Sequence, residues 1–375
     1  MASQRASGSR HLRPHGTIAG MGDADLYDYD LPRELIAQHA LEDRVAARLL
    51  VVRRSDGAIE HSHIRDLPQL LQAGDLVVWN DTRVVPARLV GRRLKTGGRW
   101  EGLFLQVDSS TGVWQLLAKS RGRAAIGERV VLIGRDGADA LSLELRGRGH
   151  GGTWLVVPDS QEPAEKILAA VGRVPLPGYI RGGHEEQGDS ERYQTVFART
   201  AGAAAAPTAG LHFTKPLLDS LAARGVGHAS VTLHVGLDTF RPIAVDTLDD
   251  HPMHSEWCHC PAETVAAICQ TRGRGGRVVA IGTTTVRTIE TAALKANASE
   301  LGQGGAFSGP TNLFIRPGFC FAATDCLLTN FHLPRTTLMV LVSAFASREL
   351  IGMAYREAIS HRYRMLSYGD AMLIL

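Results

Sequence analysis

Two patterns of apolar and polar positions divide the chain. In the first, short apolar runs predict buried strands at RLLVVRR (48–54) and GDLVVWN (74–80). The run LPRELIAQHA (31–40) instead carries its apolar residues at helical spacing behind a proline, and it predicts a helix. This part of the chain therefore combines both kinds of element.

The second pattern begins near residue 86 and consists only of short alternating runs. Glycine-rich turns separate these runs at hairpin spacing, which is typical of an all-β module. The runs are ARLVGRRL (87–94), GLFLQV (102–107), VWQLLAKS (113–120), ERVVLIG (128–134), LSLELRG (141–147) and TWLVVP (153–158). They predict a small barrel or sandwich.

Helical patterns return after residue 162 and alternate with apolar, β-branched runs of the kind that a sheet buries. Helices are predicted at 164–172, 215–225 and 262–273, and strands at 229–236 and 277–282. Strands that alternate with helices indicate an α/β fold.

A length of 375 residues is more than one average core organises, so about two domains are expected. With 44% hydrophobic and 21% charged residues, the composition is that of a globular protein. We predict a mixed-sheet α/β domain at 21–85 and 164–375, an inserted small β-barrel domain at 86–163, and a disordered N-terminal tail at 1–20.

Composition also excludes some classes of protein. No stretch approaches the ~20 apolar residues that a membrane span needs, and the best window, 338–346, is too short. The N-terminus is basic and polar without the apolar core of a signal peptide, so we expect a cytoplasmic protein. Five cysteines, an odd number in a chain of this length, do not indicate a disulfide framework.

Positive charge is concentrated in the predicted β-module. Between residues 86 and 135 there are ten basic residues against three acidic ones, although the whole chain has a formal net charge of only +3. Such a local positive field favours a polyanion partner, nucleic acid first. A solvated surface of β-hairpins would give the same pattern.

The segment VVAIGTTTVRTIE (278–290) is a candidate anion site. A hydrophobic strand ends in Gly282, and three threonines then open a helix whose free amides could bind a carboxylate or phosphate. Threonine is also an ordinary helix cap, so a structural reading stays open. The segment lacks the glycine patterns of a P-loop and of a dinucleotide fold, so neither ATP nor NAD is predicted as a cofactor.

Histidines occupy other segments with ligand-binding character. AAAAPTAGLHFT places small residues ahead of His212, which lets a ligand approach the backbone closely. VTLHVG carries His234 at the end of a predicted strand, the edge where α/β sheets bind ligands. HPMHSEWCHC (251–260) lacks the spacing of known zinc motifs, so no metal is predicted, and Glu256 is the more plausible group there, as a proton acceptor.

The order of these segments and their amino-acid sequences resemble those of the S-adenosylmethionine:tRNA ribosyltransferase-isomerase family of queuosine synthesis. The likeness runs from about Tyr27 to Ile374. Its motifs are GDLVVWNDTRVVPARLVG (74–91), APTAGLHFT (206–214), VTLHVGLDTFRP (231–242), DHPMHSE (250–256), VVAIGTTTVRTIE (278–290), TNFHLPRTTLMVLVSAFA (329–346) and YRMLSYGDAM (363–372). The resemblance implies an α/β domain with an inserted β-barrel, in a cytoplasmic and monomeric enzyme.

The resemblance also implies the reaction and the partners. Such enzymes transfer the ribosyl unit of S-adenosylmethionine to 7-aminomethyl-7-deazaguanine (preQ1) in the tRNA anticodon and isomerise it, giving epoxyqueuosine, adenine and methionine. S-adenosylmethionine is then a consumed substrate, and no cofactor is expected. The sulfonium acidifies the adjacent C5′ hydrogens, so the site needs a proton acceptor, which histidines and carboxylates can supply once desolvated.

Candidate site residues follow from these motifs. For proton transfer they are His212, His234, His254, Glu256 and His332. For substrate binding they are Asn80, Asp81, Arg83, Thr208, Gly210, Gly282, Thr283, Thr284, Arg287, Tyr368 and Asp370, and for tRNA binding Arg92, Arg93, Arg121 and Arg123.

Four positions depart from the family pattern. Asp238 stands where glycine is usual, and Gly178 replaces a proline in PLPGYI (175–180). Serine is the more usual residue at the positions of Thr285 and Ala47. Two other functions stay open, a paralogue that uses the same sulfonium chemistry on another acceptor and a tRNA-binding protein without catalysis. Adenine release with and without the right tRNA distinguishes them.

Overall fold

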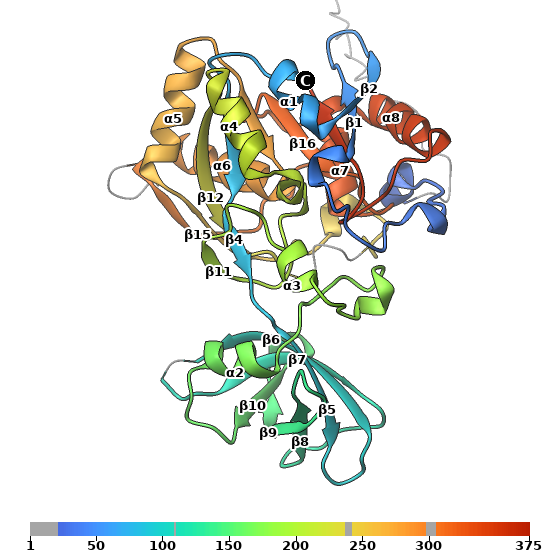
Figure 1. Ribbon diagram of the computed structural model, residues 1–375, viewed down its shortest axis with the longest axis vertical. Helices are drawn as coiled ribbons and strands as arrows, with labels where there is room; N and C mark the ends of the chain where they lie inside the picture. The colour runs from blue at the N-terminus through green and yellow to red at the C-terminus, as the bar shows by residue number, and fades with distance from the viewer. Residues whose placement is uncertain (1–21, 109, 237–241, 298–304) are drawn as a thin grey trace, which may run out of the picture.

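The computed structural model describes residues 22–108, 110–236, 242–297 and 305–375. These residues form a large α/β domain and a smaller β-barrel, joined by a narrow neck (Figure 1). The fold class predicted from the sequence is thus confirmed. The predicted tail at 1–20 and Asp238 lie outside the described residues.

A nine-stranded mixed sheet forms the centre of the α/β domain, in the order β15-β13-β12-β3-β14-β16-β17-β1-β2. Its central strands β12, β3, β14 and β16 run parallel, so their carboxyl ends meet at one edge. The strands of this sheet are β1 (Arg48–Val52), β2 (Ile59–His63), β3 (Leu76–Asn80), β12 (Gly227–Leu233), β13 (Glu256–Cys260), β14 (Val278–Ile281), β15 (Phe307–Thr311), β16 (Cys326–Asn330) and β17 (Ala371–Ile374). A separate pair, β4 (Thr82–Val84) and β11 (Thr200–Ala203), extends β3 toward the barrel.

Helices cover both faces of the sheet because its strands are apolar on both sides. Val77 and Val279 belong to one buried cluster, which includes residues of α1 and α4. Val78 and Ala280, their neighbours on the same strands, belong to the other cluster, with residues of α5 to α8. The helices are α1 (Leu67–Leu70), α3 (Asp189–Arg192), α4 (Lys215–Ala223), α5 (Ala262–Gly273), α6 (Thr283–Asn297), α7 (Thr337–Ala346) and α8 (Arg348–Ser360).

The six alternating runs form a closed barrel in the order β10-β7-β6-β5-β8-β9. Its strands are β5 (Arg88–Arg93), β6 (Arg99–Val107), β7 (Trp114–Ser120), β8 (Arg129–Ile133), β9 (Asp139–Arg148) and β10 (Trp154–Pro158). Helix α2 (Ala164–Val171) packs Ile167, Leu168 and Val171 into the barrel core. A boundary at residue 163 would leave this helix in the α/β domain, whereas its apolar face belongs to the barrel.

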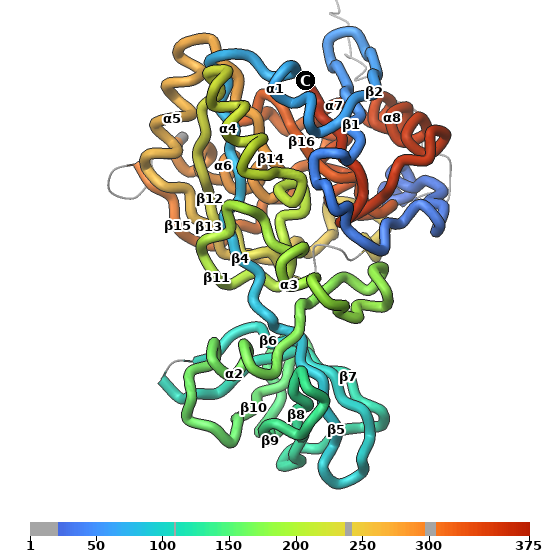
Figure 2. Tube along the Cα trace, viewed as in Figure 1, coloured from blue at the N-terminus to red at the C-terminus, as the bar shows by residue number. Residues whose placement is uncertain are grey.

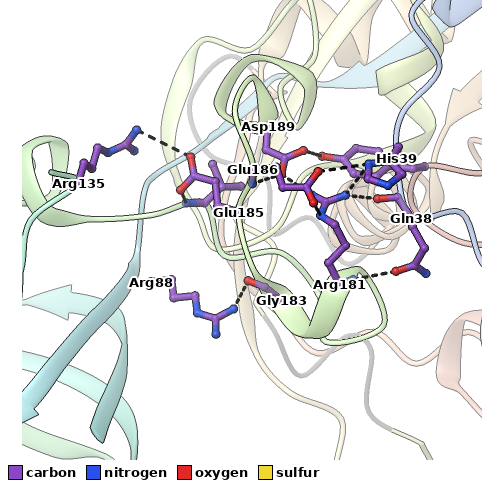
Figure 3. A network of polar contacts seen from close by, with 11 residues as sticks. Gln38, His39, Arg88, Arg135, Arg181, Gly183, Glu185, Glu186 and Asp189 are labelled. Carbon is purple, nitrogen blue, oxygen red and sulfur yellow. Dashed lines mark hydrogen bonds and ion pairs between the residues drawn. The ribbon is translucent and has the colours of Figure 1, made fainter. Parts of the chain in front are cut away.

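Two chain segments form the neck between the domains, one entering the barrel and one leaving it (Figure 2). Arg88 and Arg173 lie on these segments and exchange two backbone hydrogen bonds, of 3.0 and 2.8 Å. Side chains add polar links, which Figure 3 shows from close by: Arg88 donates to the Gly183 carbonyl, and Arg135 lies 3.8 Å from the Glu185 carboxylate. Glu185 also accepts from the Val174 amide at 2.9 Å.

The helix predicted at 31–40 is wrong, because this segment forms only a 3-10 turn over Arg33–Leu35. Its backbone pairs with a distant segment instead: Met365 N donates to the Leu35 carbonyl at 2.7 Å, and Ala37 N to the Met365 carbonyl at 3.2 Å. Pairing with a neighbouring segment thus overrides the local helical pattern.

Within the described ranges, no helix taken singly has the length and apolar character to cross a membrane. Helices α7 and α8 together have the required length and composition, but the chain bends by 112° between them.

Candidate functional site

A pocket with about 590 Å³ of empty volume, part of it open to solvent, lies at the carboxyl edge of the parallel strands. From this edge β3 continues through β4 toward the barrel (Figure 1). Five of the predicted residues line it, namely Thr208, Gly282, Thr283, Thr284 and His332. The residues that follow β14 and β16 and those that precede β17 therefore line one pocket, at the edge where α/β sheets usually bind ligands.

The amino end of helix α6 forms one wall of the pocket. Gly282 precedes the helix with a φ of 87°, a left-handed conformation that glycine adopts readily. Since glycine has no side chain to cap the helix, the first amides of α6 stay available to a ligand. The hydroxyls of Thr283 and Thr284 line the same wall, so the wall suits an anionic group.

Asn80 positions this wall without lining the pocket. Its Nδ2 donates to Thr284 Oγ1 at 3.2 Å and to the Leu233 carbonyl at 2.9 Å. Its Oδ1 accepts from the Thr82 and Leu233 amides. The side chain thereby joins the ends of β3 and β12 to the start of α6, which makes it a positioning residue for Thr284.

Asp81 and Arg83 lie toward the neck and outside the pocket lining. Asp81 accepts from the Thr232 hydroxyl at 2.7 Å and lies 2.7 Å from the guanidinium of Arg199. Arg83 is exposed on β4. The structure therefore separates these two predicted substrate residues from the pocket.

His332 also lines the pocket, two residues after the end of β16. Its Nε2 lies 2.9 Å from Thr329 Oγ1, and its backbone amide donates to the Tyr355 hydroxyl at 2.8 Å. Burial lowers the pKa of His332 to about 3, so the ring is neutral at pH 7. When the Thr329 hydroxyl donates to the Asn330 carbonyl, 3.3 Å away, Nε2 carries the proton and Nδ1 keeps its lone pair.

His212 lies in a neighbouring, smaller pocket that shares Ser367 with the first. Burial and the nearby Arg44 guanidinium lower the pKa of His212 to about 4. Tyr368 lines this second pocket and donates to Asp189 Oδ1 at 3.0 Å. Gly210, two residues before His212, is packed so closely against Phe197 that a Cβ would lie 2.8 Å from its ring.

Asp370 has a structural role at the start of β17. Its carboxylate accepts from the Arg48 amide at 3.0 Å, from Arg48 Nε at 3.1 Å and from the Arg364 amide at 2.8 Å. The residue is 1% exposed. Its oxygens thus fix the segment that forms the pocket wall.

Arg287, which was predicted to bind an anionic group of the substrate, instead bonds to other groups of the protein. Its guanidinium forms a buried ion pair with Glu256 and donates to the carbonyls of Leu313 and Thr311. Glu256 also accepts from the Gly236 amide at 2.8 Å. Neither side chain lines the pocket.

Two further histidines also lie outside the pocket lining. His234 stacks on Trp257 with ring centroids 5.3 Å apart, and its Nδ1 lies 2.9 Å from Thr82 Oγ1. Burial lowers the pKa of His234, although the Asp81 carboxylate opposes this effect. His254 is half-buried before β13.

Several polar residues that line the pocket are absent from the predicted site residues, among them Tyr179, Thr329, Asn330 and Ser367. Thr329 and Asn330 are the last residues of β16 and belong to the same motif as His332. Their place at the end of a strand, beside a predicted site residue, could therefore have been predicted from the sequence. Tyr179 and Ser367 come from two loops far apart in the chain and share a 2.7 Å hydrogen bond, which no local pattern indicates.

The barrel arginines differ in how exposed they are. Arg121 and Arg123 are exposed, and Arg92 pairs at the surface with Asp139. Arg93 is 9% exposed, with its guanidinium bound to Glu128 at 2.6 Å and to the carbonyls of Arg121 and Arg123. Arg93 therefore holds the loop that presents Arg121 and Arg123.

Together, fold and pocket define an α/β protein that has an open pocket at the carboxyl edge of its parallel strands and carries an inserted β-barrel. The family model described as queuosine biosynthesis protein matches residues 24–374. The chain belongs to this queuosine biosynthesis family, as its motifs predicted.

Known relatives are similar over nearly the whole chain. The S-adenosylmethionine:tRNA ribosyltransferase-isomerase of Symbiobacterium thermophilum is 50% identical over 350 residues, 93% of this chain and 98% of that protein. The enzyme of the same name from Xanthomonas oryzae pv. oryzae is 49% identical over 355 residues, 93% of this chain and 95% of that protein. A crystal structure of S-adenosylmethionine tRNA ribosyltransferase from Thermotoga maritima matches with a TM-score of 0.52 and 37% identity, covering 93% of this chain and 100% of that one. The chain is accordingly an enzyme, a transferase and isomerase of tRNA modification.

Proposed function

We propose that this enzyme transfers the ribosyl unit of S-adenosylmethionine to preQ1 at the wobble position of a tRNA anticodon and isomerises it, releasing adenine and methionine. The observation that carries the proposal is the pocket between the amino end of α6 and His332, in a chain of this family. S-adenosylmethionine is consumed as a substrate, and no cofactor takes part. We expect a cytoplasmic monomer.

In this proposal the amino end of α6 binds the methionine carboxylate. The first amides of the helix and the hydroxyls of Thr283 and Thr284 supply donors, and the helix dipole favours a negative charge there. Thr208 and the backbone at Gly282 complete this wall.

His332 is the group proposed to exchange the proton. It is the only one of the five candidates that lines this pocket within the described ranges. Its neutral ring offers Nδ1 to the C5′ hydrogen that the sulfonium acidifies, and the loss of this proton gives an ylide. Adenine then leaves, the tRNA amine forms a bond to the ribosyl unit, and methionine leaves when the bond between its sulfur and C5′ breaks. His212, behind Ser367, would support this pocket from the adjoining cavity.

Isothermal calorimetry and adenine release test the proposal together. The full chain should bind S-adenosylmethionine, and adenine should appear only when tRNA bearing preQ1 is present. His332→Gln should lower the rate of adenine release by ~10²-fold or more while S-adenosylmethionine still binds. Adenine release without tRNA would instead indicate a different acceptor, and absence of release would indicate a tRNA-binding protein without catalysis.

A further inference from the structure

A cluster of two histidines and one glutamate lies on the surface, between the edge strand β2 and the end of α8. Figure 1 labels both of these elements. His61 lies on β2, Glu357 lies in the last turn of α8, and His361 is the C-cap residue of that helix. One ligand atom from each of the three lies within 4.8 Å of the other two. All three side chains are between 40% and 53% exposed.

The spacing of these atoms fits a tetrahedral metal ion. His61 Nε2 lies 3.2 Å from Glu357 Oε1, and His361 Nδ1 lies 3.1 Å from the same oxygen. Zinc bonds of ~2.0–2.1 Å place neighbouring ligand atoms of a tetrahedron about 3.3 Å apart, which these two distances match. The two imidazole nitrogens lie within 4.8 Å of each other and would move together around the ion. Two imidazoles and one carboxylate are a ligand set that zinc uses with water as the fourth ligand.

The orientation of His61 supplies an independent argument. Its Nδ1 lies 2.8 Å from the hydroxyl of Tyr363, a side chain that is 1% exposed. A hydrogen bond at one ring nitrogen fixes the ring and directs the other nitrogen, as is usual for metal-bound histidines. Nε2 is thereby held toward Glu357.

The same contacts could be simple ion pairs between histidine and carboxylate. The chain has other exposed pairs of that kind, His39 with Glu186 and His63 with Asp66. In the described part of the chain, only the cluster at the end of α8 brings two imidazoles to one carboxylate with the spacing of a metal site. We propose that His61, Glu357 and His361 bind a divalent transition-metal ion, Zn²⁺, at the surface.

Such an ion would also order the wall of the substrate pocket. Arg48 donates to the His361 carbonyl at 2.8 Å and to the Asp370 carboxylate at 3.1 Å, and its guanidinium lies 4.2 Å from the centre of the Tyr363 ring. The segment between these residues includes Leu366 and Ser367, which line the pocket. The metal site is therefore linked to the pocket while lying outside it.

Calorimetric titration of the full chain with ZnCl₂ tests the site, after removal of bound metal with a chelator and desalting. The exposed thiols Cys269 and Cys320 are replaced by serine in every sample, because thiolates also bind zinc. We expect one zinc ion per chain, no comparable binding of Mg²⁺, and affinity reduced at least ~10-fold by His361→Ala and by Glu357→Gln. Tyr363→Phe, which removes only the hydroxyl beside His61, should weaken binding by about 10-fold.

His63→Ala is the matched control, since it removes an exposed histidine two residues along the same strand and should leave zinc binding unchanged. Circular dichroism checks that each variant is folded. Zinc binding that is absent in the parent, or equally strong in folded His361→Ala and Glu357→Gln, would overturn the proposal.

Discussion

At the scale of single residues, the two neutral histidines beside the pocket make stability depend on pH. Burial lowers the pKa of His332 to about 3 and that of His212 to about 4, whereas an unfolded histidine titrates near 6.5. Below pH 6.5 the unfolded chain takes up protons that the folded chain does not, so the folded state loses stability as the pH falls. Each histidine should reduce the free energy of unfolding by about 2 kcal/mol between pH 7 and pH 5.

Urea unfolding at pH 7 and pH 5 measures this loss. His332→Gln and His212→Gln should each remove about half of the part due to these two rings, and the double variant should remove all of it. A pH dependence identical in the parent and the double variant would show that neither ring is held neutral.

The residue scale also marks how far sequence could predict the site. Gly282, Thr283 and Thr284 were predictable because a strand, a glycine and a helix start follow one another in the chain. The ion pair of Arg287 with Glu256 joins side chains 31 residues apart on different elements. Nothing in the sequence near Arg287 indicates that its guanidinium turns to the protein and not to a ligand.

At the scale of elements, the barrel depends on Arg93. Its guanidinium lowers the pKa of Glu128 by a direct hydrogen bond and also binds two carbonyls of the loop at 121–123. Arg93→Ala would leave that carboxylate without its partner, so we expect the unfolding temperature of the barrel to fall by several degrees.

Differential scanning calorimetry tests this expectation. Arg121→Ala with Arg123→Ala is the matched control, because these exposed side chains lie in the same loop and their loss should change the unfolding temperature little. A barrel that unfolds at the same temperature in both proteins would contradict a structural role for Arg93.

Elements were predicted best where the local pattern and the packing agree. The six barrel strands alternate because one side of each faces the barrel core. The helix prediction for residues 31–40 was wrong because the backbone of this segment forms hydrogen bonds with Met365. The helical spacing of apolar residues does not indicate such a partner. Helix α2 was found, yet its attachment to the barrel depends on which core its apolar face meets.

At the scale of the whole molecule, the pocket lies at the carboxyl edge of the sheet, whereas Arg121 and Arg123 lie at the end of the barrel away from the neck. Arg121 N donates to the carbonyl of Arg99, which pairs with Arg92 at the far end of β5, the strand that leaves the neck at Arg88. We expect tRNA to contact both the pocket and these two exposed arginines. Arg121→Ala with Arg123→Ala should weaken tRNA binding and reduce the slope of log affinity against log salt by about 2, since each lost phosphate contact removes roughly 0.9.

Fluorescence anisotropy with labelled tRNA at several salt concentrations provides the measurement. Arg224→Ala serves as the control, because Arg224 follows α4 at the amino edge of the sheet, away from the neck. If the double variant keeps the parent's salt slope, tRNA docks elsewhere on the protein.

The backbone contact between Arg88 and Arg173 has one further consequence. The chain leaves the sheet and comes back to it at adjacent points, a separation that a tight turn can close. The order and direction of the nine strands would be the same if the barrel were deleted or exchanged for another module. Evolution could therefore change which partner the inserted barrel binds while the strand order of the α/β domain stayed the same.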